Sequence, residues 1–169
     1  MSWTRNALRS SRALTSALAL LVLSPAGAVP SEEPAPPSPA PGDVVPAFDA
    51  TGIDGRSQHV AYSKGTTVLV FFLSSCPTCH RMIPLWNRAF QHKPAGLQVV
   101  GVLMDQEPPN FFATTAISFP VVRSPGKEFL QKWKVSRAPL MVRVAPGGKV
   151  EDVSMGYADA IRVGEVFKP

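Results

Sequence analysis

The feature of this 169-residue sequence that most constrains its fold is an apolar run that leads into two cysteines. Residues 67–73 read Thr-Val-Leu-Val-Phe-Phe-Leu, and residues 76–79 read Cys-Pro-Thr-Cys. A continuous run of β-branched and aromatic residues predicts a strand that is buried on both faces of a sheet. The residues from Cys79 to about Phe90 predict a helix, in which Pro84 should introduce a kink. We therefore expect the two cysteines at a strand-to-helix junction of a layered α/β domain.

The rest of the domain alternates strand and helix signals. Asp54-Gly55 and Pro146-Gly147-Gly148 each separate two extended segments, so both are interpreted as hairpin turns. The order βββαβαβαββα predicts one mixed sheet that helices cover on both faces. Strands are expected at 44–50, 56–60, 67–73, 97–104, 119–122, 140–145 and 149–155, and helical segments at 79–90, around 111–112, at 127–133 and at 159–167.

Residues 1–28 have the pattern of an export signal. Three arginines and no acidic residue precede an apolar stretch from Ala13 to Leu23. This stretch fits a signal-peptide core of ~7–15 residues and is shorter than the ~20 residues that span a bilayer. The small residues Ala26, Gly27 and Ala28 predict cleavage after Ala28. We expect an exported, periplasmic protein, and the alternative is an N-terminal anchor that is not cleaved.

Residues 29–42 contain six prolines and predict an extended, Pro-rich linker, so that the globular domain covers residues 43–169. The formal net charge is +5, but three of the arginines lie within residues 1–28. The domain therefore has little net charge. Its small basic patch of Lys132, Lys134 and Arg137 is too modest for a nucleic-acid surface.

The two cysteines are the residues most suited to chemistry. The N-terminus of a helix carries partial positive charge and free N–H groups, which favour a thiolate at Cys76. We expect Cys76 to be the attacking nucleophile, and Cys79, one turn later, to resolve the mixed disulfide by forming the Cys76–Cys79 disulfide. Pro77, Thr78 and His80 are expected to tune the acidity of the Cys76 thiol. A purely structural disulfide is the alternative, although so small a ring would constrain the chain little.

Further positions complete this pattern. Three features occur together: the apolar strand with its cysteine motif, Pro84 eight residues after Cys76, and Ala138-Pro139 before the last hairpin. In this combination the sequence resembles the thioredoxin superfamily. The sequence also has an export signal, an early hairpin and a long stretch between the motif and Pro139. With these features it resembles the TlpA/ResA-like exported thiol–disulfide oxidoreductases, and the resemblance covers residues 43–156. The resemblance implies a thioredoxin-like fold, in which helices flank a central mixed sheet that has an extra N-terminal β-hairpin. It also implies an enzyme that exchanges disulfides with client proteins.

The same resemblance implies a layout for the site and its partners. The Ala138–Pro139 bond is expected to be cis. Ala138, Pro139 and Leu140 are expected to form the groove for the client peptide, beside the sulfurs. The expected partners are a client protein with a disulfide or a dithiol and a membrane electron-transfer protein for recycling. No prosthetic group is implied, a monomer is expected, and the direction of exchange stays open.

Three positions depart from the family pattern. Ser75 stands where the family usually has tryptophan, and Val70 and Met82 stand where relatives carry a buried acid that helps to move protons. The run Ser-Ser-Cys-Pro-Thr-Cys at 74–79 is instead similar to the MauD-type redoxins of methylamine-utilisation maturation. Without the usual acid, the sequence assigns no residue to proton transfer.

His80 raises the alternative of haem. Cys-x-x-Cys-His is also the signature of covalent c-type haem attachment, with His80 as the axial ligand. An exported protein can receive haem, so the compartment does not separate the two interpretations. The context favours thiol chemistry, because this motif ends an apolar strand of an α/β pattern. Met104, moreover, is expected inside a buried strand and not in an exposed loop.

Copper is a further alternative, since two thiolates and His80 form a suitable set of ligands. Copper-assembly redoxins usually pair their cysteines with a distant histidine on a loop. His59 and His92 are instead expected to be ordinary surface residues, so we expect no metal.

Asp105, Gln106 and Glu107 follow the second buried strand and are interpreted as a solvated loop. Trp86 and Trp133, at helical spacing within apolar faces, are expected in the core.

Overall fold

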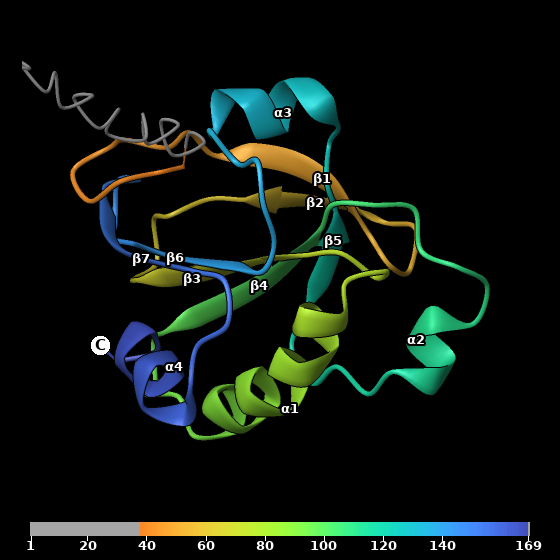
Figure 1. The fold of residues 1–169 in the computed structure, drawn as a ribbon. Coiled ribbons are helices and arrows are strands. Elements are labelled where there is room, and N and C mark those ends of the chain that lie inside the picture. Colours follow the sequence, from red (N-terminus) through yellow and green to blue (C-terminus); the bar gives the residue numbers. More distant parts are fainter. Residues whose placement is uncertain (1–37, 169) are drawn as a thin grey trace, which may run out of the picture. The chain divides into compact units, whose positions relative to one another are not determined.

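The computed structural model describes residues 38–168, which form a seven-stranded sheet with helices on both faces (Figure 1). The expected export signal at 1–28 and most of the expected linker at 29–42 lie outside the described residues and stay predictions. Among the helices of residues 38–168, none is both long and apolar enough to cross a membrane. The elements follow the expected order: β1 Phe48–Gly52, β2 Ser57–Val60, β3 Thr67–Phe72, α1 Pro77–Gln91, β4 Gln98–Leu103, α2 Phe111–Thr114, β5 Val121–Arg123, α3 Lys127–Lys132, β6 Leu140–Val144, β7 Val150–Met155 and α4 Ala160–Val166.

The strand that leads to the cysteines lies inside the sheet. The strand order is β2-β1-β5-β4-β3-β6-β7. β3 pairs in parallel with β4 and antiparallel with β6, and β4 pairs in parallel with β5. All six residues of β3 are buried, as the apolar run predicted. Because β3 and β4 are parallel, the loops that follow them leave the sheet at the same edge.

The N-terminal hairpin of β1 and β2 is confirmed, but its first strand begins later than expected. Val44 was expected to start this strand, which in fact begins at Phe48. Val44 instead forms an isolated bridge with Lys149, and the N–H of Val45 donates to the carbonyl of Gly148 at 2.8 Å. A Cβ at Gly148, whose φ is +91°, would lie 2.4 Å from the carbonyl oxygen of Val45. Only glycine permits this close approach.

The sheet separates two apolar layers, and the expected tryptophans lie one in each. Trp86 of α1 is fully buried in the layer beneath α1 and α4. Trp133, which follows α3, is 1% exposed in the layer on the opposite face. Both were expected in the core, and both expectations are confirmed. The expectation for Met104 is wrong, because β4 ends at Leu103 and leaves Met104 half-buried beyond it.

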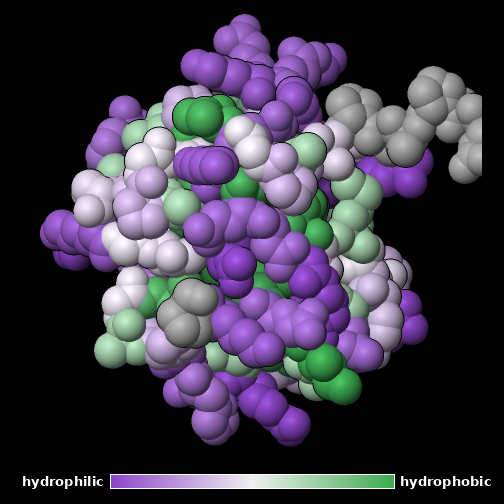
Figure 2. Space-filling view, turned by 90° about the vertical axis from the view of Figure 1, so that its left-hand side faces the viewer, coloured by the Kyte–Doolittle hydropathy of each residue, from purple (hydrophilic) through white to green (hydrophobic). Residues whose placement is uncertain are grey.

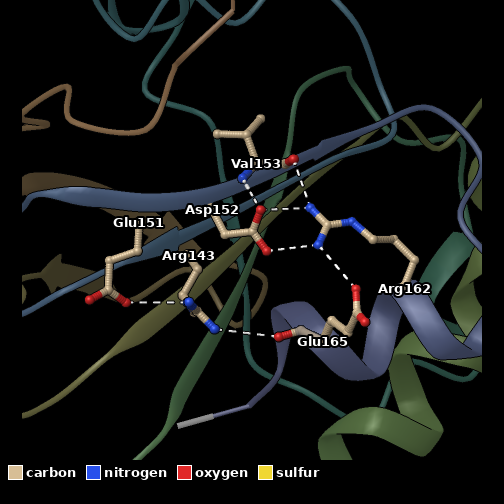
Figure 3. Close-up of polar contacts among 6 residues, drawn as sticks. All are labelled: Arg143, Glu151, Asp152, Val153, Arg162 and Glu165. Carbon is tan, nitrogen blue, oxygen red and sulfur yellow. Dashed lines mark hydrogen bonds and ion pairs between the residues drawn. The ribbon is translucent and has the colours of Figure 1, made fainter.

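The β7 edge of the sheet carries ion pairs that attach α4 to it (Figure 3). Asp152 of β7 accepts hydrogen bonds from Arg162 of α4 at 2.6 and 2.9 Å, and Arg143 of β6 pairs with Glu151 at 3.2 Å. The guanidinium beside Asp152 holds the pKa of that carboxyl below its ordinary value. Figure 2 shows the side of the molecule that lies on the left in Figure 1, where β7 is, and most of this face is hydrophilic. Such a charged edge discourages pairing with another strand.

Candidate active site

Cys76 lies between β3 and α1, where it forms the N-cap of the helix. Its backbone is extended, with φ −87° and ψ 114°, and its Sγ accepts a hydrogen bond from the N–H of Cys79 at 3.3 Å. α1 therefore begins at Pro77 and not at Cys79 as expected, because a proline needs no hydrogen-bond acceptor in the first turn. The half-buried Cys76 thus occupies the predicted helix N-terminus, where the helix dipole favours a negative charge.

Cys79 differs from Cys76 in its access to solvent. Both are free thiols in this structure, but Cys79 is 0% exposed. Burial raises the pKa of the Cys79 thiol to about 12, and the hydrogen bond with Cys76 and the negative charges of Cys76 and Asp105 contribute to the same shift. Cys79 is therefore protonated at neutral pH and out of reach of a macromolecule.

Asp105 is a site residue that the sequence interpretation missed. Its carboxylate accepts hydrogen bonds from the N–H and hydroxyl of Ser74, at 2.7 and 3.0 Å, and from those of Ser75, at 3.2 and 3.0 Å. Burial raises the pKa of this carboxyl, but the four hydrogen bonds together outweigh burial and hold the pKa below its ordinary value. The signal that could have found it is its position at the end of β4, parallel to the end of β3. Asp105 does lie in a loop after β4, as expected, but it is half-buried and bonded to Ser74 and Ser75 rather than solvated.

His80 is exposed, and its ring is held in place. Nε2 lies 2.7 Å from the carbonyl oxygen of Ser74, to which a protonated Nε2 donates. The ring also meets Phe111 edge-on, with centroids 5.9 Å apart. In this structure Nε2 is thus occupied by the backbone and not available as an axial ligand. Within residues 38–168, no three side chains of His, Cys, Asp or Glu gather closely enough to hold a metal ion.

The Ala138–Pro139 peptide bond is cis. Ala138 and Cys76 both pack against the apolar cluster that contains Cys79. Leu140 pairs with Phe71, so this segment lies at the end of the strand that leads to the cysteines. The side chain of Leu140 lies elsewhere: it is fully buried and belongs to the cluster on the α3 face. Because successive strand residues point to opposite faces, the side chain of Leu140 does not line the expected groove.

The loop after β7 contacts the cis-proline segment. The sequence analysis did not predict this contact. The N–H of Gly156 donates to the carbonyl of Pro139 at 2.8 Å. The next residue, Tyr157, is 59% exposed, and the guanidinium of Arg81 on α1 lies 5.6 Å from the centroid of its ring. An exposed aromatic ring, one residue after the partner of Pro139, therefore contacts a cation on α1.

The comparisons with known proteins agree with this geometry. A family model described as Redoxin matches residues 40–162. The chain belongs to the redoxin family. Among curated proteins, the thiol-disulfide oxidoreductase ResA of Bacillus subtilis is 26% identical over 138 residues, which cover 73% of this chain and 77% of ResA. A Mycobacterium tuberculosis protein named as a peroxiredoxin is 32% identical over 100 residues, which cover 55% of this chain and 62% of that protein.

Solved structures show the same likeness. StoA of B. subtilis superimposes with a TM-score of 0.64 at 21% identity, over 73% of this chain and 98% of StoA. A DsbE-type thiol:disulfide interchange protein of Chlorobium tepidum also gives 0.64, at 25% identity, over 74% and 92%. A secreted M. tuberculosis disulfide oxidoreductase gives 0.60 at 16% identity, over 71% and 93%. The expected TlpA/ResA-like membership of the thioredoxin superfamily and the thioredoxin-like fold are confirmed, and the chain is a thioredoxin-like redox enzyme.

Proposed function

We propose that this protein exchanges disulfides with client proteins, with Cys76 as the nucleophile and Cys79 as the resolving thiol. The observation that carries the proposal is the unequal burial of the two sulfurs. Cys76 is half-buried at the N-terminus of α1, whereas Cys79 is fully buried one turn later. One thiol can therefore meet a client, and the other can meet only its partner.

In the reductive direction, the Cys76 thiolate attacks one sulfur of a client disulfide. A bond forms between Cys76 and that sulfur, the client S–S bond breaks, and the second client sulfur leaves as a thiolate that takes up a proton. Cys79 then loses its proton and attacks the Sγ of Cys76. The Cys76–Cys79 disulfide forms, the client leaves as a dithiol, and two electrons have passed to it. The reverse sequence oxidises a client dithiol.

The client is proposed to bind between the cis-proline segment and the start of α1. Ala138 packs against the apolar cluster that contains Cys79, and the carbonyl of Pro139 accepts a hydrogen bond from Gly156. The exposed ring of Tyr157, stacked under Arg81, extends this surface with an apolar and cationic contact. We assign the tuning of Cys76 acidity to its neighbours Pro77, Thr78 and His80, of which His80 is fixed through its bond to the turn.

We also propose an exported, periplasmic location, with a membrane electron-transfer partner for recycling. The basic and apolar pattern of residues 1–28 supports it, as does the likeness to a disulfide oxidoreductase described as secreted. Detection of the mature protein in a periplasmic fraction, with an N-terminus at Val29 by mass spectrometry, checks the location. An intact N-terminus in the membrane fraction would indicate an anchor.

The likeness to a protein named as a peroxiredoxin favours hydroperoxide reduction as a second candidate function. Cys76 would then attack the peroxide, releasing water or an alcohol and becoming a sulfenic acid, which Cys79 would convert to a disulfide with loss of water. Consumption of hydrogen peroxide with dithiothreitol as reductant separates this candidate from exchange with insulin.

Trapping with two matched variants tests the main proposal. Cys79→Ala retains the nucleophile and should accumulate mixed disulfides with clients, because the chain contains no third cysteine to release them. Cys76→Ala should trap none. The adducts are read as reducible bands on non-reducing gels of periplasmic extract, and mass spectrometry names the partners. Trapping by Cys76→Ala alone reverses the roles, and trapping by neither variant contradicts the proposed exchange.

A further inference from the structure

One carboxylate holds the turn that carries Cys76. Asp105 accepts two backbone N–H groups and two hydroxyls from Ser74 and Ser75. Ser74 is only 4% exposed, so its N–H and hydroxyl need partners inside the protein. Ser75 directly precedes Cys76, and the position of the reactive sulfur therefore depends on these bonds.

The same turn is held from its other side. The carbonyl of Ser74 accepts from Nε2 of His80 at 2.7 Å, so the N–H, the hydroxyl and the carbonyl of this one residue are all bonded. His80 belongs to α1, whereas Asp105 follows β4. Hydrogen bonds thus connect the turn both to α1 and to the end of β4, and Asp105 makes the connection to β4.

Asp105 also carries a negative charge without a cation to compensate it. Within residues 38–168, no ion pair includes Asp105, and its four donors are all neutral groups. Glu107, the neighbouring carboxylate, is by contrast paired with Arg123. Lys127 lines the open cleft that borders both carboxylates but forms no pair with Asp105.

This charge acts on the resolving thiol. Burial is the largest cause that raises the pKa of Cys79, followed by its hydrogen bond with Cys76 and then by the negative charges of Cys76 and Asp105. Once Cys76 is bonded to a client, its sulfur carries no charge, and that contribution ends. The charge of Asp105 persists through the mixed disulfide and opposes the Cys79 thiolate that must form to resolve it.

We propose that Asp105 sets the lifetime of the mixed disulfide: its carboxylate positions Cys76 through the Ser74–Ser75 turn, and its uncompensated charge opposes formation of the Cys79 thiolate. This inference rests on the proposed exchange function, to which it adds a positioning residue.

The resolution step can be measured alone. Cys76 is loaded with 5-thio-2-nitrobenzoate as a mixed disulfide, and Cys79 then attacks the Cys76 sulfur. The Cys76–Cys79 disulfide forms and the thionitrobenzoate anion leaves, which its visible absorbance reports. The rate should rise with pH as Cys79 ionises. Asp105→Asn should move this rise to lower pH and make release at neutral pH about 3- to 10-fold faster.

Two matched variants separate charge from geometry. Ser75→Ala keeps the charge of Asp105 but loses one hydrogen bond to it. It should slow the attack of Cys76 on dithionitrobenzoate about threefold and leave the pH dependence of thionitrobenzoate release as in wild type. Glu107→Gln removes a carboxylate that is already compensated by Arg123 and should leave the pH profile unchanged. Asp105→Glu keeps the charge but displaces the bonds, so it should slow loading without moving the resolution profile.

The inference is overturned if Asp105→Asn resolves with the wild-type pH profile or a profile moved to higher pH. Should Asp105→Asn not fold, a profile moved to lower pH in Asp105→Glu overturns it, and an unmoved profile with slower loading supports it. The assay needs no client protein. If wild type resolves thionitrobenzoate but does not reduce insulin, and Cys79→Ala traps no client, the proposed function is contradicted and the role of Asp105 stands.

Discussion

Two carboxylates at different places in this sheet both have a pKa below the ordinary value, and they reach it by different means. Asp152, at the β7 edge, is held by hydrogen bonds from the guanidinium of Arg162. Burial opposes the ionisation of Asp105, but four hydrogen bonds from uncharged donors more than offset the effect of burial. The charge of Asp152 is therefore compensated where it lies, whereas that of Asp105 acts on nearby groups. A lowered pKa alone does not separate a structural ion pair from a site residue; the chemistry of the partner does.

The two regions also differ in what they hold. Arg162 links Asp152 to the carbonyl of Val153 and to Glu165, so the network joins α4 to β7 and contains no reactive group (Figure 3). The bonds of Asp105 end one residue before Cys76. Damage to the first network should therefore appear as lost stability, and damage to the second as altered thiol chemistry.

The largest effect is expected at the thiols beside Asp105. Iodoacetamide should label Cys76 in the native, reduced protein at least about 100-fold faster than Cys79 at neutral pH, because the buried Cys79, with its pKa of about 12, is almost entirely protonated. Peptide mass spectrometry gives both rates. Labelling in urea is the control, where the two rates should agree within a few-fold. Faster native labelling of Cys79 would contradict the assigned roles.

The next largest effect is expected in the stability of the β7 edge. Arg162→Met should lower the free energy of unfolding by about 1–2 kcal/mol, since it leaves Asp152 without its partner. The loss is smaller than for a fully buried ion pair, because the side chains of Arg162 and Asp152 are 35% and 23% exposed and solvent screens them. Urea unfolding measures the loss, and thionitrobenzoate release should be unchanged.

Arg56→Met is the matched control for this change, because Arg56 and Asp54 form a pair whose side chains are 86% and 50% exposed. It should leave stability almost unaltered. If Arg162→Met changed the pH profile of resolution as Asp105→Asn is expected to do, the division between a structural and a functional carboxylate would fail.

The sequence predicted those parts of the site that local patterns determine. The apolar run and the cysteine spacing indicated β3 and the helix N-terminus, whereas the cis Ala138–Pro139 bond was expected only from the family resemblance. The role of Asp105 was not predicted, because its partners lie 30 and 31 residues earlier in the sequence. Only the parallel pairing of β3 with β4 brings them together. Before that pairing is known, an acidic residue after a strand has the pattern of a solvated loop.

Leu140 illustrates a different limit. Adjacency to Pro139 in the sequence indicated a shared groove, but the pleat of β6 turns neighbouring side chains to opposite faces. Leu140 pairs with Phe71 of β3 and packs in the layer under α3. Here the alternation of strand residues was readable in the sequence, whereas the face that each residue takes depended on which layer each helix covers.

The smallest effect is expected in acid. Both carboxylates have a folded-state pKa below the unfolded value of ~3.9, so each stabilises the fold above that value, and its contribution is lost as pH falls through the folded pKa. Asp152→Asn should therefore flatten the loss of stability between about pH 5 and pH 2 by roughly 1 kcal/mol or less. Urea unfolding across this range measures it, and Asp54→Asn is the exposed control.

Combining this change with Arg162→Met tests whether the two regions are independent. Once Arg162 is absent, Asp152 has lost the first cause of its lowered pKa, so Asp152→Asn should flatten the acid limb no further. Asp105→Asn should still flatten it in that background, because its partners are the Ser74–Ser75 turn and not a cation. Distant sites with no shared partner contribute additively, whereas members of one network do not. A loss of the Asp105 contribution in the Arg162→Met protein would show that the β7 edge and the cysteine turn are one coupled network.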